Sequence, residues 1–589
     1  MTKHRQLYNY NDKLKVKDKL FTPLAGVRLG DGLFKEVFEN NINYLKTLDD
    51  GSMMYWFDKK TGTPTDAQPY TGHFEDNLKG STLSMFLMGA GNTLRWVDDD
   101  ELRRRVSVLM DKLRSSAEED GFLMPVDQTR FAYKEYPHYV RIWLTYGLCA
   151  VALSCEDEDA YGLLRRWQDW FNSCIDLPII KYLELAFQGV VASPYVYTTP
   201  IGKREDIDTT IEAYEEPWRL AQFMRREKDC VHIRKQPGRE PHAHGTELEG
   251  FEGYLDLYRA TGRNYYLDAV MGAWELYRRD WQHVGGGIVM IEGMMENLYP
   301  GCRWIDPQKK YNELCCTSFW MYLNLRLHRL FPDEEVYMDE VEKSLFNLCF
   351  AAQEADKGIR YFNNLEGRKV QPGGIHCCCG VGTRIYGSMP EFIFSIAPDA
   401  VAVNMYAPSE IDWEREDGVV TIKNEGNIPY RDDVKLTLSM AKPANFDLRL
   451  RIPRWTAAND GVGISVNGEK VCTGRPGSYA VISREWADGD VVEYTLRQAW
   501  VITKYSGADE FPQFSRYYIQ RGPVLYGITA PSVRRARQIG WSVSDFEKWI
   551  TPNETPLHYD IAMHSDCELV PYYEIGCDVD FTCVPVVTD

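Results

Sequence analysis

The stretch LDLYRATGRN (Leu255–Asn264) decides the fold class of this chain. Its apolar residues recur at helical spacing, and this pattern stops at Gly262. Glycine commonly follows the last turn of a helix because it accepts a left-handed backbone. A second helical pattern begins at once and includes Tyr266–Trp274. Similar spacing recurs between residues 21 and 398, for example in Leu102–Leu113. Repeated helix pairs over this length predict an α/α toroid.

The pattern changes near residue 399 to short runs that alternate between apolar and polar residues, such as Val434–Leu438. Turn residues such as Asn467-Gly468 separate these runs, which therefore predict antiparallel strands of a β-sandwich. The pattern weakens after residue 530. We divide the chain into four parts: a strand or tail at 1–20 that packs on the β domain, a helical domain at 21–398, a β-sandwich at 399–530, and a small C-terminal β layer or wrapped tail at 531–589.

The size and charge of the chain exclude several classes of protein. Its 589 residues exceed what one hydrophobic core usually supports, so we expect two or three domains. A net charge of −19 would repel a phosphate backbone, so we expect no nucleic-acid partner. No apolar run is long enough to cross a membrane, so we expect no membrane association either.

Two features bear on the cellular compartment. The first residues, Met1–Gln6, include basic side chains, but no apolar run of signal-peptide length follows them. The sequence as it stands predicts a cytoplasmic protein, or a periplasmic one if a signal peptide has been removed. The 15 cysteines are an odd number without the regular spacing of a disulfide scaffold, so we expect most of them to be reduced.

Three adjacent cysteines, Cys377, Cys378 and Cys379, form the strongest chemical signal. They lie in the glycine-rich stretch Ile375–Gly382 rather than on an apolar helical face. Adjacent thiols do not easily form a disulfide with one another, but two of them can present sulfur to one metal ion where the backbone bends. The alternative is that these cysteines are small buried apolar residues without a chemical role.

A second cluster, Glu313-Leu314-Cys315-Cys316, precedes the helical run Phe319–Leu327. In an extended entry to a helix, residues two apart face the same side, so Glu313 and Cys315 can both approach one metal ion. The alternative is that Glu313 only adds a favourable charge at the start of the helix.

These two clusters resemble the β-L-arabinofuranosidase family of glycoside hydrolases and its uncharacterised relatives. The Glu-x-Cys segment of that family is similar to Glu313–Cys315, and its Cys-Cys pair with a following arginine is similar to Cys377-Cys378 with Arg384. The resemblance extends over most of residues 20–530. Further similar segments are Gly72–Phe74, Tyr139–Trp143, Asp256–Gly262, Leu448–Trp455, Val466–Gly468 and Gln520–Pro523.

The resemblance implies a multidomain α+β chain in which an N-terminal (α/α)6 barrel precedes antiparallel β-sandwich domains. It implies that Cys377 is a nucleophile and that Zn2+ is held by four residues, namely Cys377, Cys378, Cys315 and Glu313. The family places its acid/base glutamate shortly before the ligand glutamate, where this sequence offers Glu296, which we favour, and Glu292. The residues that would contact the substrate are His242, His73, Arg384 and Trp143.

The implied function is that of a retaining exo-glycoside hydrolase that removes a terminal furanosidic sugar from pectic glycans of the plant cell wall. The sugar would be β-L-arabinofuranose or a related branched or acidic furanose. Glycosidases usually use two carboxylates, and here a zinc-bound thiolate would replace one of them. The partner would be an oligosaccharide or glycan, and assembly as a homodimer stays open.

Two other interpretations stay open. The first is a non-catalytic carbohydrate-binding protein with a structural zinc site, because closed, thiolate-rich zinc sites are commonly structural. The second is a helical-barrel glycosidase or lyase that uses paired acids such as Glu247 and Glu249, with inert cysteines. The roles of Cys316 and Cys379 also stay open. His242 fits two roles equally well, a histidine hydrogen-bonded within the fold and a sugar contact.

Overall fold

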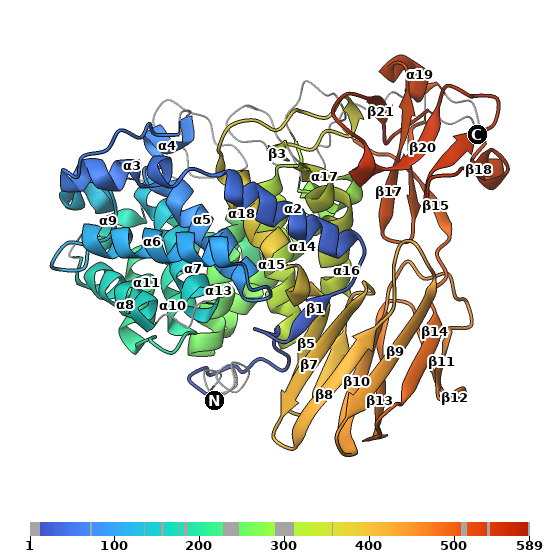
Figure 1. Cartoon of the computed structure of the whole chain (residues 1–589), viewed down its shortest axis with the longest axis horizontal. Coiled ribbons are helices and arrows are strands. Elements are labelled where there is room, and N and C mark those ends of the chain that lie inside the picture. The colour runs from blue at the N-terminus through green and yellow to red at the C-terminus, as the bar shows by residue number, and fades with distance from the viewer. Residues whose placement is uncertain are drawn as a thin grey trace.

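The structure is a computed structural model in which a helical region precedes a region of β-sheets (Figure 1). Both regions contain the kinds of elements that their sequence patterns predict. The structure describes residues 12–70, 73–134, 136–154, 158–174, 176–181, 186–227, 247–288, 305, 311–355, 357–507, 515–538 and 542–586.

In the described residues, the inner wall of the barrel is a closed ring of helical segments. Each segment packs on the next, and the last returns to the first. Several of these helices are buried almost all round, as expected for helices surrounded by other elements. In order around the ring they are α5 (Ser81–Leu94), α7 (Tyr136–Ser154), η2 (Ala186–Val191) with α10 (Ala192–Tyr197), α13 (Glu247–Thr261), α15 (Leu314–Leu330) and α18 (Cys377–Gly387).

The outer helices each bury one face against this ring. In α6 (Asp100–Ser116), for example, the buried residues recur at helical spacing from Leu102 to Leu113. Among the described residues, no helix combines the length and the apolar character that crossing a membrane requires. Other outer helices are α2 (Leu33–Thr47), α8 (Glu158–Ser173), α11 (Arg204–Tyr214), α14 (Asn264–Leu276) and α16 (Val336–Ser344).

Neighbouring inner helices run parallel and approach closely at glycines. An added Cβ at Gly147 of α7 would lie 3.0 Å from Leu87 Cβ of α5, and one at Gly91 of α5 would lie 2.8 Å from Ala150 Cβ of α7. The point of contact thus advances toward the C-terminus along both helices together, which shows that α5 and α7 are parallel. Helix α18 shows the same register against α5, where Gly380 meets Met85 and Gly387 meets Thr93. The first turns of these helices therefore lie at one end of the barrel.

The helix pair that decides the fold class has the predicted form. Helix α13 ends at Thr261, Gly262 takes the left-handed backbone with φ +71°, and α14 begins at Asn264. A residue with a side chain would be strained at this positive φ, so glycine is favoured at this turn. Together with the closed inner ring, this confirms the predicted α/α barrel.

Two sheets pack face to face to form the β-sandwich. Trp413 on one sheet and Phe446 on the other have ring centroids 5.1 Å apart. All strand pairs in these sheets are antiparallel except β6 with β10, which pair in parallel. The first sheet has the order β1 (Val27–Leu29), β7 (Ser409–Arg415), β8 (Gly418–Asn424), β9 (Asp433–Met440), β14 (Val491–Thr495), β11 (Val462–Val466) and β12 (Glu469–Gly474), and the second has β13 (Ser478–Trp486), β10 (Ala444–Ile452), β6 (Ala400–Val403) and β5 (Phe394–Ile396).

A third sheet gathers the strands after residue 499. It joins strands before residue 530 to strands near the C-terminus, so in the structure the change of sheet falls between β14 and β15. It also includes β4 (Glu366–Gly367), which comes from the helical part of the sequence and pairs with β21. The other members are β15 (Trp500–Lys504), β16 (Tyr517–Arg521), β17 (Val524–Ala530), β20 (Glu568–Pro571), β19 (Tyr559–Ile561), β18 (Ile550–Pro552) and β21 (Asp580–Thr582).

The N-terminal segment connects the barrel to the sandwich. The backbone N–H groups of Lys15 and Lys19 donate to the carbonyl oxygens of Arg259 and Arg329 in the last turns of α13 and α15. Strand β1 then pairs with β7 of the sandwich. Because inner helices begin at the other end of the barrel, this segment lies at the base, opposite the first turns.

A buried ion-pair network joins the barrel to the sandwich. Arg451 on β10 is fully buried; its Nε donates to Glu335 Oε1 over 2.9 Å and its Nη2 donates to Glu342 Oε2 over 3.0 Å. Replacement of Arg451 by methionine leaves Glu342 without its cation and Glu335 with only the more distant Arg454, 3.6 Å away, so we expect the free energy of unfolding to fall by about 3–5 kcal/mol. Urea denaturation monitored by circular dichroism measures the change.

Arg28→Met is the matched control, because Arg28 also joins the N-terminal strand to the sandwich but is about half exposed and pairs with Glu410 and Asp412 at the surface. Exposed ion pairs contribute roughly 0–1 kcal/mol. If Arg451→Met shifted the urea midpoint no further than Arg28→Met, the buried network would not stabilise this junction.

Candidate active site and metal centre

The first site segment is held at the entry to α15. Asn312 takes a left-handed backbone with φ 53°, and Glu313 follows in an extended conformation immediately before the helix. Leu314 N–H donates to the carbonyl of Tyr361 over 3.1 Å, and Glu313 forms a β-bridge with Phe362. This backbone pairing fixes the direction in which Glu313 and the first turn of α15 face.

The second site segment is the first turn of α18. His376 is extended, with φ −150° and ψ 170°, and the helix begins at Cys377. The change from extended to helical backbone lets Cys377 and Cys378 bring their sulfurs to one side, 4.0 Å apart. Since α15 and α18 are adjacent and begin at the same end, the two segments meet there.

Four side chains form what we call the thiol–carboxylate cluster, and all of them are buried: Glu313, Cys315, Cys377 and Cys378. One potential ligand atom from each lies within 4.8 Å of all the others, and the Cys315 and Cys378 sulfurs are 3.2 Å apart. All three cysteines are free thiols. Such a convergence of soft and charged donors could hold a metal ion.

The electrostatics of the cluster favour a bound cation. Burial raises the pKa of the Cys315 and Cys378 thiols well above the ordinary range. Burial acts in the same direction on Cys377, but hydrogen bonds from the other two thiols outweigh it and hold the pKa of Cys377 well below that range. Burial and mutual repulsion thus oppose ionisation of all three thiols together, and a nearby cation would offset that cost.

The two extra cysteines lie beside the cluster without joining it. The Cys316 thiol donates to Glu313 Oε2 over 3.4 Å. The Cys379 sulfur is 3.6 Å from both ring nitrogens of His376 and 3.7 Å from the Gly374 carbonyl oxygen. Neither belongs to the group of mutually close ligand atoms.

The structure describes the side chains of only some of the other predicted site residues. Glu296, Glu292 and His242 lie outside the described residues, as does the side chain of His73, whose backbone begins α4 (His73–Asn77). Trp143 on α7 is buried, with its ring centroid 5.7 Å from that of Tyr139.

Arg384 on α18 has its guanidinium carbon 4.1 Å from the Tyr146 ring centroid and 3.7 Å from that of Tyr322. These two rings hold it inside the barrel, below the thiol–carboxylate cluster.

The two acids of the rival interpretation have unlike surroundings. Glu247 forms a buried ion pair with Arg219, and burial, opposed by Arg219, raises the pKa of Glu247 to about 7. Burial also raises the pKa of Glu249 well above its ordinary value; the charges of Glu252 and Cys377 add to this rise, and those of Arg384 and Arg326 oppose it. Neither carboxyl oxygen of Glu249 has a hydrogen-bond partner among the described residues. Burial therefore favours the protonated form of Glu249, and its carboxyl oxygens are not engaged by other described residues.

One functional feature has no signal in the sequence. The carbonyl oxygen of Tyr361 receives both the Leu314 N–H and, over 3.7 Å, the Cys378 thiol. The Tyr361 ring also lies 5.0 Å from the His376 ring. Tyr361 thus holds the two site segments together, largely through a main-chain atom that every residue type carries.

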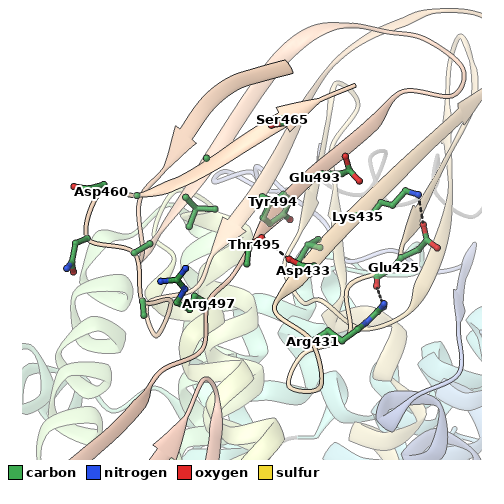
Figure 2. A pocket seen from close by; sticks show the side chains of 17 residues that line it. Glu425, Arg431, Asp433, Lys435, Asp460, Ser465, Glu493, Tyr494, Thr495 and Arg497 are labelled. Carbon is green, nitrogen blue, oxygen red and sulfur yellow. Dashed lines mark hydrogen bonds and ion pairs between the residues drawn. The ribbon is translucent and has the colours of Figure 1, made fainter. Parts of the chain in front are cut away.

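A separate hollow of about 1040 Å³ lies on the β-sandwich (Figure 2). Some of its charged side chains bind one another or nearby groups: Lys435 lies 4.0 Å from Glu425, Arg431 donates to the Glu425 carbonyl, and Thr495 donates to Asp433. The one aromatic residue that lines it, Tyr494, is buried. The hollow therefore offers no exposed ring on which a sugar could stack.

Family models and solved structures agree with this architecture. Residues 26–391 match the model described as "Beta-L-arabinofuranosidase, GH127 catalytic domain", and residues 400–498 match the GH127 middle domain. No curated protein matches the chain.

Among solved structures, a GH127 β-arabinofuranosidase is 18% identical with a TM-score of 0.75, and the match covers 98% of this chain and 99% of that one. A GH127 β-L-arabinofuranosidase from Geobacillus stearothermophilus T6 is also 18% identical, with a TM-score of 0.74 and coverage of 96% and 100%. At this identity the structures support the fold, while the catalytic model spans more than half of the sequence. The chain therefore belongs to the GH127 β-L-arabinofuranosidase family and is a glycoside hydrolase.

Proposed function

We propose that this glycoside hydrolase removes terminal β-L-arabinofuranose, or a related branched or acidic furanose, from pectic glycans by a retaining mechanism with Cys377 as nucleophile. The observation that carries the proposal is the meeting of Glu313 and Cys315 with Cys377 and Cys378 at one end of the barrel. Relatives of the same fold are named as arabinofuranosidases, which supports the choice of sugar.

We propose zinc as the metal, held by the thiol–carboxylate cluster. Tetrahedral zinc with thiolates at about 2.3 Å needs sulfurs roughly 3.8 Å apart. The separations of 3.2 Å and 4.0 Å in the cluster lie on either side of this value. Zinc bound there would supply the positive charge that keeps the buried thiols ionised.

The residues of the chain would then act in two displacement steps. The Cys377 sulfur attacks the anomeric carbon and forms a C–S bond while the glycosidic C–O bond breaks, and Glu296 gives its proton to the leaving oxygen. In the second step Glu296 takes a proton from water, the water oxygen attacks the same carbon, and the C–S bond breaks to restore the thiolate. Two inversions at one carbon retain the configuration.

Product analysis tests the substrate and the stereochemistry. Incubation with aryl β-L-arabinofuranosides should release L-arabinose that first appears as the β-anomer, as proton NMR would show. The matched α-linked aryl glycosides should react much more slowly. Binding of pectic side chains without release of any sugar would favour the non-catalytic carbohydrate-binding alternative.

Removal of the metal is expected to abolish turnover. We expect about one zinc per chain, and prolonged treatment with a strong chelator should remove both zinc and activity, with recovery when zinc is added back. Because ligand thiols must lose protons to bind metal, extraction should be faster at lower pH. Metal analysis and initial rates measure the two losses together.

Chelator saturated with zinc beforehand serves as the control and should leave the activity unchanged. The metal assignment would be refuted by protein that contains no metal and still turns over at the original rate. If the metal-free protein is inactive and regains activity only with another divalent ion, that ion would replace zinc as the assigned metal.

A further inference from the structure

A cavity of about 160 Å³ lies at the base of the barrel, away from the thiol–carboxylate cluster. Its walls come from the second halves of inner helices and from the N-terminal segment that crosses the base, including Asp18 and Phe21. Arg384 lies seven residues after Cys377 on α18, which corresponds to roughly 10 Å along the helix. The cavity is therefore separate from the site where the sugar would react.

Five arginines line the cavity, and one of them has no ion pair in the described part of the chain. Four arginines that line it form ion pairs: Arg95 with Glu391, Arg259 with Asp18 and Asp256, Arg326 with Glu252, and Arg329 with Asp18. Each of the four carboxylates in these pairs thus has its cation. The fifth arginine of the lining, Arg384, has no ion pair among the described residues.

Arg384 is also without a hydrogen-bond partner in the described part of the chain, although only 8% of its surface is exposed. Its contacts are the faces of the Tyr146 and Tyr322 rings. Such contacts offset part of the cost of burying a guanidinium, but they satisfy none of its N–H groups. The Tyr146 hydroxyl, which is buried beside the same cavity, likewise has no hydrogen-bond partner among the described residues.

We propose that this cavity binds a small monovalent anion, a halide or a short carboxylate, between the Arg384 guanidinium and the Tyr146 hydroxyl. One anion can pair with the one arginine that lacks an ion pair and can accept hydrogen bonds from both unsatisfied donors. A volume that about five water molecules would fill admits such an anion with some water and excludes an oligosaccharide. The bound anion stabilises the base of the barrel, where the N-terminal segment is attached.

Thermal unfolding of the full chain tests the proposal. Sodium bromide and sodium acetate are each titrated at constant ionic strength, with sodium gluconate, whose anion is too bulky for the cavity, as the replacement salt. We expect the unfolding midpoint to rise with bromide or acetate in a saturable way, since an anion that binds only the folded state stabilises it. Absence of any saturable rise would overturn the proposal.

The Arg384→Gln variant should unfold at a midpoint that no longer depends on bromide or acetate. Arg103→Gln is the matched control, because Arg103 is exposed and pairs with Asp98 at the surface, and it should keep the dependence. An equal dependence in Arg384→Gln and in the unchanged protein would contradict the assignment.

Bromide soaks of crystals of the unchanged protein decide the case even if Arg384→Gln does not fold. We expect an anomalous-scattering peak in the cavity within hydrogen-bond distance of Arg384. Peaks confined to surface cations would overturn the proposal. Neither measurement involves turnover, so the result is independent of the proposed glycosidase mechanism.

Discussion

Cys377→Ser is expected to lower kcat on an aryl β-L-arabinofuranoside by a factor on the order of 10⁴ or more, as removal of a nucleophile does in other enzymes with covalent intermediates. The serine hydroxyl stays protonated at neutral pH, whereas the cluster lowers the pKa of the Cys377 thiol and so favours the thiolate. The side chains are close in size, so the loss comes from chemistry rather than from packing. Steady-state rates with the nitrophenyl glycoside measure the effect.

Cys379→Ser is the matched control, because Cys379 is two residues further along the same turn, is also buried, and contacts His376 rather than the cluster. It should keep kcat within a factor of a few. Metal analysis of Cys377→Ser separates loss of the nucleophile from loss of the ion. A metal-loaded Cys377→Ser protein with full activity would refute the nucleophile assignment.

Mass spectrometry gives a second test of the same residue. A slow substrate with a good leaving group should leave one pentose unit on the peptide that contains Cys377. The glycosylated peptide should disappear in Cys377→Ser and persist in Cys379→Ser. Attachment of the sugar to a glutamate, such as Glu249, would instead favour a mechanism that uses paired acids.

The helical half of the fold was predictable because its signals are local. Helix α13 ends just before Gly262 and α14 begins at Asn264, and both residues lie in the ten-residue stretch Leu255–Asn264. The closed ring of inner helices could not be predicted from such local signals. It depends on tertiary contacts at glycines such as Gly91 and Gly147, and a glycine inside a helical pattern does not reveal which neighbour approaches it.

The change from one β-sheet to the next shows the limit of strand patterns. The runs in β14 and β15 alternate in the same manner, but β14 pairs with β9 and β15 pairs with β16. Alternation shows that a strand has one buried face and does not identify its partner. Strand alternation therefore predicts a sandwich that continues to residue 530, whereas the change of sheet lies near 499.

The site divides in a similar way. Each half of the thiol–carboxylate cluster is a short motif, but only the resemblance to a known family joins Cys315 to Cys378 across 63 residues of sequence. The role of Tyr361 could not be predicted because it acts through its backbone carbonyl, which every residue type has. Glu249 could be named as a candidate acid, but the sequence does not show that Arg219 pairs with Glu247 and Arg326 with Glu252 rather than with Glu249.

Glu296→Gln is expected to separate substrates by their leaving groups. With an alkyl arabinofuranoside, whose leaving oxygen needs a proton, kcat/KM should fall by about 10²–10⁴. With a nitrophenyl arabinofuranoside the first step needs no proton, so kcat/KM should change little. The second step would still lack its base, so the glycosylated enzyme should accumulate and a burst of nitrophenol should precede slow turnover.

Glu292→Gln and Glu249→Gln are the matched comparisons, because each also replaces a carboxyl group by an amide of the same shape. If Glu296 is the acid/base, these two variants should lose similar factors on both substrates or nothing at all. A leaving-group dependence in Glu292→Gln would transfer the role to Glu292. The same dependence in Glu249→Gln would assign the proton to Glu249, the buried acid near Cys377 whose raised pKa favours the protonated form that a general acid needs.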